Sequence, residues 1–244
     1  SGIMLKKFKA FAGEPAPFVM ELPAYHAPSA SNVLRSMWER GWSFIKRAGT
    51  IILLSTIILW FLSNFGFTDG GFGWVEDSDA SLLAAVGSVI AVIFIPLGFG
   101  NWQAAVATIT GLIAKEEVVS TMQVFYPGDL IANIAMAFTA ASAYSFMVFN
   151  LLCAPCFAAM GAIKREMNNA KWTWAAIGYM CGFAYVASLI VYQLGGLLTG
   201  TVTFGVWTVV ALAALAAIIY LLVRKGYQGE DRSRQLSSVA AAAR

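Results

Sequence analysis

Six long apolar segments constrain the fold of this chain more than any other feature of its sequence. A helix needs about 20 apolar residues to cross the hydrocarbon core of a bilayer, and most of the segments approach or exceed that length. They cover residues 48–65, 81–98, 104–126, 134–163, 173–196 and 204–223. Because 59% of the 244 residues are hydrophobic and only 12% are charged, an ordinary soluble domain is excluded. We therefore predict an all-α, polytopic helical membrane protein with about six transmembrane or re-entrant segments, surrounded by membrane lipids.

The charges of the loops predict how these segments are oriented. Basic residues precede the first segment, follow the fourth and follow the sixth, whereas the loop after the first segment holds only acids. The basic residues are Arg35, Arg40, Lys46, Arg47, Lys164, Arg165, Lys171, Arg224, Lys225, Arg232 and Arg234, and the acids are Asp69, Glu76, Asp77 and Asp79. By the positive-inside rule, both termini and the loop 164–172 are cytoplasmic. Six crossings fit this pattern; a re-entrant hairpin of the second and third segments, leaving four crossings, is the alternative.

Composition divides the chain into three regions. Residues 1–47 are predicted to form a cytoplasmic connector with an amphipathic helix. Residues 13–28 are predicted to be its extended part, because they contain four of the seven prolines. Residues 48–223 form the helical membrane domain, and residues 224–244 form a polar, then alanine-rich cytoplasmic tail. The only histidine, His26, lies in the connector, where we expect it to be exposed rather than a metal ligand.

A proline interrupts the fourth apolar segment near its middle. Pro155 has no N–H and its ring clashes with the carbonyl of Leu151, so a helix here is predicted to kink or split and to free that carbonyl. Two thiols flank the break, in the sequence Asn150-Leu-Leu-Cys153-Ala-Pro-Cys156. Freed backbone carbonyls beside a pair of soft ligands are typical of a site where a transition metal crosses a membrane. The alternatives are two small buried cysteines and a proline that only bends the packing.

Three adjacent charges, Lys115, Glu116 and Glu117, lie inside the third apolar segment. Each costs at least a few kcal/mol near the bilayer centre, so such residues are functional candidates by default. On a continuous helix, one polar face would contain Thr110, Ala114, Glu117 and Thr121. One interpretation is that a carboxylate holds or dehydrates a cation. The other is a structural ion pair, in which Lys115 neutralises a carboxylate from another segment.

These residues together define the predicted site. The metal-ligand candidates are Cys153, Cys156, Glu116 and Glu117, and the gate or structural candidates are Pro155, Lys115 and Asn150. Divalent iron is borderline in softness and accepts thiolate and carboxylate together. No P-loop, GxSxG, HExxH or Rossmann glycine pattern occurs, and no patch that would bind nucleic acid, so we expect a chain that is not an enzyme. An intramembrane thiol oxidoreductase that uses Cys153 and Cys156 as a redox pair is the enzymatic alternative.

Several blocks of the sequence, in order, resemble the C-terminal membrane half of the bacterial ferrous iron transport protein B family. The blocks are Glu21-Leu-Pro-Ala-Tyr-His26, Arg47-Ala-Gly-Thr-Ile-Ile52, Asn101-Trp-Gln-Ala-Ala-Val106, Gly111-Leu-Ile-Ala-Lys-Glu-Glu-Val118 and Cys153-Ala-Pro-Cys-Phe-Ala-Ala-Met-Gly-Ala-Ile-Lys164. The resemblance implies Fe²⁺ as a transported substrate, taken up across the bacterial inner membrane by a multi-pass protein. It also implies a domain of the Gate type, corresponding to the second of two such repeats.

The resemblance assigns the family's thiol motif to Cys153, Pro155 and Cys156, and its membrane glutamate to Glu116, whereas the helical face favours Glu117. Family members carry a GTP-binding domain and a first Gate repeat, and neither is found in these 244 residues. GTP is therefore expected to act only through that domain, which together with the first repeat is the expected partner. Self-association of the chain is a further expectation. A nucleoside-type Gate transporter or a scaffold subunit is the remaining alternative.

Overall fold

A computed structural model of the protein describes residues 2–6, 29–68, 71–75, 78–126 and 128–224. Residues 7–28 of the predicted connector, which include His26, and the tail after Arg224 lie outside the described residues, so the three-region division stays a prediction. Residues 28–211 form one compact unit that contains every contact of the candidate site.

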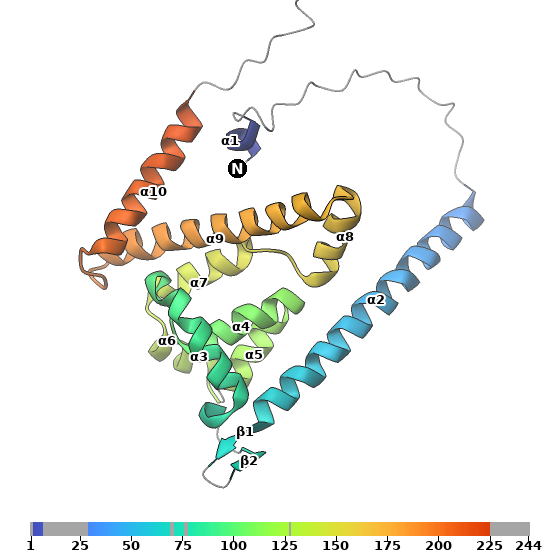
Figure 1. Ribbon diagram of the computed structural model, residues 1–244, viewed down its shortest axis with the longest axis horizontal. Helices are drawn as coiled ribbons and strands as arrows, with labels where there is room; N and C mark the ends of the chain where they lie inside the picture. The colour runs from blue at the N-terminus through green and yellow to red at the C-terminus, as the bar shows by residue number, and fades with distance from the viewer. Residues whose placement is uncertain (1, 7–28, 69–70, 76–77, 127, 225–244) are drawn as a thin grey trace, which may run out of the picture. The chain divides into compact units, whose positions relative to one another are not determined.

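The described residues are mostly helical, as predicted (Figure 1). The helices are α1 Gly2–Lys6, α2 Ala30–Asn64, α3 Leu82–Phe94, α4 Trp102–Ile113, α5 Glu117–Phe125, α6 Leu130–Ala137, α7 Ala140–Leu152, α8 Phe157–Met167, α9 Ala170–Leu198 and α10 Val206–Val223. Two short 3₁₀ helices, η2 Ser78–Ala80 and η3 Ile95–Leu97, and two short strands, β1 Phe65–Thr68 and β2 Gly71–Trp74, complete the described elements.

Several of the predicted apolar segments are bent or broken rather than straight. Among the described residues, α9 with 29 residues and α10 with 18 are long and apolar enough to cross a membrane. Two further pairs qualify only jointly, because α3 with η3 turns by 97° into α4, and α6 turns by 102° into α7. The described helices thus supply two to four candidate spans, and six separate straight crossings are not what they show. The all-α membrane class is confirmed.

The third predicted segment is a helical hairpin, not one helix. α4 ends at Ile113 and α5 begins at Glu117, with Ala114 extended at φ −148° and ψ 136° between them. The two arms pack against each other: the Trp102 and Phe125 rings are 4.8 Å apart, and a Cβ on Gly111 would approach Val118 to 2.6 Å. The prediction of one continuous helical face was therefore wrong, because the chain reverses at residues 114–116.

Side chains from neighbouring helices satisfy the carbonyls that the end of α3 leaves open. Pro96 lies in η3, where a regular α-helical ladder stops. Tyr185 Oη donates to the Ile93 carbonyl at 2.9 Å and Gln193 Nε2 donates to the Pro96 carbonyl at 2.9 Å. Ser145 Oγ donates to the Leu97 carbonyl at 2.8 Å. In an apolar environment an unsatisfied carbonyl costs several kcal/mol, so these bonds permit the break.

Helices α7 and α9 lie side by side and are joined by a pair of buried serines (Figure 1). The hydroxyls of Ser145 and Ser188 are 2.7 Å apart, and Ser188 Oγ donates to the Ser145 carbonyl at 2.8 Å. Both residues are fully buried. Small hydroxyl residues allow close approach of membrane helices and hydrogen-bond across them, which fixes the register of this pair.

A short β-hairpin follows α2, in a loop where no strand was predicted. Its register pairs Phe65 with Trp74 and Phe67 with Phe72, so the four aromatic side chains share one face. The rings of each pair are 5.7 Å apart, and Phe67, Phe72 and Trp74 are each more than half exposed. Gly66 faces Ala80, whose carbonyl leaves no room for a Cβ. Exposed aromatic clusters of this kind are typical of the membrane–water interface.

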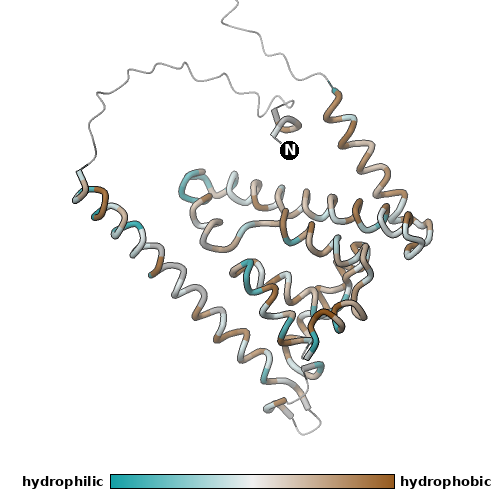
Figure 2. Tube along the Cα trace, turned by 180° about the vertical axis from the view of Figure 1, so that it is seen from behind, coloured by the Kyte–Doolittle hydropathy of each residue, from teal (hydrophilic) through white to brown (hydrophobic). Residues whose placement is uncertain are grey.

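The turn between α8 and α9 is polar. Asn168 takes the left-handed conformation at φ 44°, and the side chain of Asn169 accepts from the N–H of Lys171 to start α9. Lys164 and Arg165 lie in the last turn of α8, where their charges favour the helix dipole. Figure 2 shows this turn as a hydrophilic cap on largely apolar helices.

The Gly98→Ala substitution should lower stability. Gly98 has φ 85°, and an added Cβ would overlap the Tyr192 ring, so backbone strain alone costs about 1–3 kcal/mol. Gly178→Ala is the matched control: this glycine lies inside α9 with no atom near an added Cβ, and alanine should stabilise the helix by about 0.5–1 kcal/mol. Thermal unfolding in detergent measures both, and equal effects would contradict the assigned close contact.

Candidate functional site

The chain between α7 and α8 is the first component of the candidate site. α7 ends at Leu152 and α8 starts at Phe157, so residues 153–156 form a non-helical link that contains Pro155. This confirms the predicted break. Cys153 caps α7 and is buried, with 6% of its surface exposed, whereas Cys156 precedes α8 and is partly exposed. Neither cysteine is in a disulfide.

The tip of the α4–α5 hairpin is the second component, and it meets the first through Lys115. The ammonium of Lys115 donates to the backbone carbonyl of Asn150 at 2.6 Å and to the Cys153 sulfur at 3.1 Å. In a continuous helix, the Asn150 carbonyl would accept from the N–H of residue 154, but the helix has already ended there. The carbonyl that gains a partner across the break is thus that of Asn150, one residue before the Leu151 carbonyl expected from the sequence.

The Asn150 side chain lies inside this contact and is only partly satisfied. Its Nδ2 donates to the Phe146 carbonyl at 2.9 Å. Its Oδ1 is buried and has no hydrogen-bond partner among the described residues. A Cβ on Gly111 would lie 3.5 Å from this oxygen, so the absence of a side chain at Gly111 keeps space in front of it. The role of Gly111 was missed from the sequence, because a glycine inside an apolar helix predicts close packing but not its partner.

The two glutamates have different surroundings. Glu116 is exposed, and Glu117 starts α5 and lines a cavity of about 200 Å³ between α2 and the α4–α5 hairpin. Thr110 and Thr121, whose hydroxyls are 3.0 Å apart, also line this cavity. The polar residues predicted to share a helical face therefore do gather, but around a cavity and across the hairpin.

The predicted metal ligands do not converge into one closed site. Within residues 29–68, 71–75, 78–126 and 128–224, no group of three or more His, Cys, Asp and Glu side chains could hold a metal ion. The structure instead brings together Lys115, Asn150 and Cys153, and places Glu117 in the separate cavity. The predicted ion pair of Lys115 is not seen: the one salt bridge in the described part of the chain joins Arg35 and Glu39.

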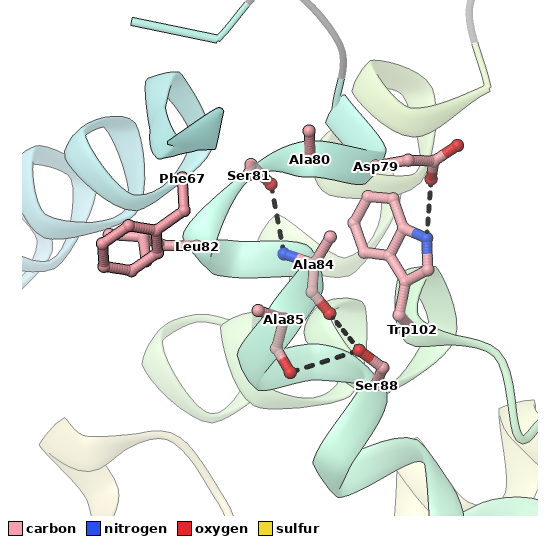
Figure 3. Close-up of a pocket in the computed structure, with 9 residues that line it drawn as sticks. All are labelled: Phe67, Asp79, Ala80, Ser81, Leu82, Ala84, Ala85, Ser88 and Trp102. Carbon is pink, nitrogen blue, oxygen red and sulfur yellow. Dashed lines mark hydrogen bonds between the residues drawn. The ribbon is translucent and has the colours of Figure 1, made fainter. Parts of the chain in front are cut away.

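A second cavity of about 350 Å³ lies beside the start of α3 (Figure 3). The indole Nε1 of Trp102 donates to the carboxylate of Asp79 at 2.9 Å on its wall. The Ser81 side chain accepts from the N–H of Ala84 and caps α3, and the Ser88 hydroxyl turns back to the carbonyls of its own helix. The polar groups named here that line this cavity are therefore hydrogen-bonded within the local fold.

The chain matches two protein-family models. The model described as "Nucleoside recognition", the Gate domain, covers residues 45–170, and the model described as "Ferrous iron transport protein B C terminus" covers residues 1–40. The first of these matches takes in both halves of the candidate site. No solved structure matches the chain.

Curated relatives match most of this chain but only part of their own length. The Fe(2+) transporter FeoB of Staphylococcus aureus (strain COL) is 40% identical over 185 residues, which covers 75% of this chain and 27% of that protein. The Fe(2+) transporter FeoB of Methanocaldococcus jannaschii is 37% identical over 198 residues, which covers 77% of this chain and 29% of that protein. The Fe(2+) transporter FeoB of Campylobacter jejuni is 34% identical over 205 residues, which covers 78% of this chain and 33% of that protein. The chain thus spans far less than two thirds of the length of these relatives.

The two thiols of the break should differ in their rate of alkylation. We expect a chain that retains only Cys156 to react several times faster with iodoacetamide than one that retains only Cys153, because Cys153 is buried against Lys115. Mass spectrometry of the folded protein in detergent measures the rates, and equal rates in denaturant provide the control. Faster reaction of Cys153 in the folded state would contradict the geometry of the link.

Proposed function

The chain belongs to the ferrous iron transport protein B family, as part of its C-terminal membrane region, and on this premise we propose that it forms part of a path for Fe²⁺ across the bacterial inner membrane. The observation that carries the proposal is the meeting of two helix breaks at Lys115, Asn150 and Cys153. Backbone carbonyls, a thiol and an amide oxygen at such a crossing offer a cation temporary ligands without a closed cage.

The cavity at Glu117 is the proposed approach to this crossing. A carboxylate beside the hydroxyls of Thr110 and Thr121 attracts a hydrated divalent cation and can replace part of its water shell. Thiols then suit the partly dehydrated ion, since Fe²⁺ accepts both oxygen and sulfur. Cys153 and Cys156, on either side of the link, are the proposed successive sulfur ligands, with Pro155 keeping the link non-helical.

The rest of the transporter is proposed to come from outside these 244 residues. The whole proteins to which the chain is similar are three or more times as long as the region it covers. We propose that the GTP-binding domain and a first Gate repeat of such a protein complete the path, or that copies of this chain associate to do so. Both described termini are proposed to face the cytoplasm, in keeping with the basic residues near the first segment, at the α8–α9 turn and after α10.

The other functional classes have less support. A thiol oxidoreductase has no counterpart among these relatives, which are named as Fe(2+) transporters. A nucleoside carrier or scaffold subunit rests on the description of the Gate model alone. Nucleoside binding that is unchanged when both Cys153 and Cys156 are replaced by serine would favour that class.

Replacing both thiols should weaken Fe²⁺ binding. We expect anaerobic Fe²⁺ affinity of the purified chain to fall at least about tenfold in Cys153→Ser/Cys156→Ser, which corresponds to about 1.4 kcal/mol. Cys181→Ser, which changes a partly exposed cysteine in the middle of α9, should leave the affinity unchanged. Competition with excess Mg²⁺ separates a sulfur-containing site from a purely oxygen site. Equal affinity of the double variant and the original chain would remove the thiols from the proposed path.

The two glutamates should respond differently to neutralisation. Glu117→Gln removes the carboxylate that lines the cavity, so we expect a several-fold loss of Fe²⁺ affinity. Glu116→Gln makes the same chemical change at the adjacent exposed position and should have little effect. Anaerobic binding titrations of both variants measure the difference. A loss confined to Glu116→Gln would move the proposed carboxylate back to the position favoured by the resemblance.

A further inference from the structure

The contacts of Lys115 resemble those of a bound cation. Its ammonium contacts the Asn150 carbonyl oxygen at 2.6 Å and the Cys153 sulfur at 3.1 Å. A partly buried lysine is usually neutralised by a carboxylate, but in the described part of the chain Lys115 forms no salt bridge. The positive charge is instead held by a carbonyl oxygen and a sulfur, which are also atoms that bind metal ions.

The residue whose carbonyl accepts from Lys115 also carries an unsatisfied side-chain oxygen. Asn150 is 91% buried, because 9% of its surface is exposed, and its Oδ1 has no hydrogen-bond partner among the described residues. Buried polar atoms are nearly always paired, so an orphaned amide oxygen suggests a ligand that is not yet bound. The Asn150 carbonyl and the Cys153 sulfur meet at the Lys115 ammonium, and this amide oxygen belongs to the same asparagine, so the local donors are two oxygens and one sulfur. Such a mixed set suits a divalent cation of intermediate softness.

The position of Lys115 in the chain allows its ammonium to move away from Asn150 and Cys153. It lies in the short non-helical tip between α4 and α5, next to the extended Ala114, and not within a rigid helix. Its ammonium ends a flexible four-carbon stem. The position it holds can therefore be vacated by rotation of one side chain, without breaking either helix.

We propose that the Lys115 ammonium is a tethered cation that occupies the metal position of the resting chain, and that Fe²⁺ binds there by displacing it. This inference rests on the proposed function. When the metal binds, the Cys153 thiol releases its proton to water, the Asn150 oxygens become ligands, and the ammonium leaves with its charge unchanged. A positive charge, from either Lys115 or the metal, then always occupies the contact between the α4–α5 tip and the α7–α8 link. A metal ion must bind there strongly enough to compete with Lys115.

Removing the tethered charge should tighten metal binding. Co²⁺ is the probe, because its thiolate complexes absorb in the near ultraviolet and report directly on sulfur ligation. We expect Lys115→Met and Lys115→Gln to bind Co²⁺ about tenfold more tightly than the original chain, the equivalent of about 1.4 kcal/mol. Lys171→Met, at an exposed position at the start of α9, is the matched control and should leave the affinity unchanged.

The unmodified chain offers a second measurement that does not depend on a variant folding. Reductive methylation of Lys115, followed by mass spectrometry, should increase when Co²⁺ saturates the site, because the displaced ammonium becomes accessible. Methylation of Lys171 should not change. Unchanged methylation of Lys115 in the Co²⁺-saturated chain would overturn the proposal.

The outcomes separate this inference from the proposed function. If Cys153→Ser loses the Co²⁺ absorption while both Lys115 variants bind no more tightly than the original chain, the cation site stands and the tethered-cation role is overturned. If neither the original chain nor any Lys115 variant binds Co²⁺, the cation site itself is absent, and the proposed function and this inference fail together.

Discussion

The need to satisfy backbone carbonyls in an apolar environment organises this structure. Straight helices meet that need internally, but this chain breaks its helices at several points, three of which are η3, residues 114–116 and residues 153–156. At the first break, side chains of α7 and α9 donate to three carbonyls. At the third, the donor is a charged side chain from the second break. Breaks of the first kind stabilise the fold, whereas the contact between the other two carries a full charge and is the one available for ion chemistry.

Features set by one residue's chemistry could be predicted from the sequence. Pro155 removes a donor and clashes with the preceding turn, so the break in the fourth segment was foreseeable within one residue. The break at residues 114–116 was not, because alanine, lysine and glutamate all favour helices. It depends on α5 packing back against α4, where Gly111 admits Val118, and such tertiary packing leaves little trace in local sequence.

The same distinction applies to the candidate site. Charges inside an apolar segment drew attention to Lys115 and Glu117, but the groups that lie beside them depend on the reversal of the chain. A helical face was expected to bring Glu117 near Thr110 and Thr121; the hairpin does so by another route. The aromatic hairpin after α2 was missed because its strands are only four residues long, with glycines between the rings that weaken any strand pattern.

The carbonyl bonds around η3 also determine which parts of the molecule can move. Sliding α9 by one residue along α3 would strip donors from the carbonyls of Ile93 and Pro96 together, and would break the Ser145–Ser188 contact as well. The Gln193–Pro96 and Ser145–Ser188 bonds are buried, and each such loss costs roughly 1–3 kcal/mol, so sliding of α9 against α3 and α7 is disfavoured. The α4–α5 tip reaches the α7–α8 link through the hydrogen bonds of the long, flexible Lys115 side chain. Lys115 can therefore leave its partners by rotation of its own side chain, while the buried bonds of α3, α7 and α9 stay in place.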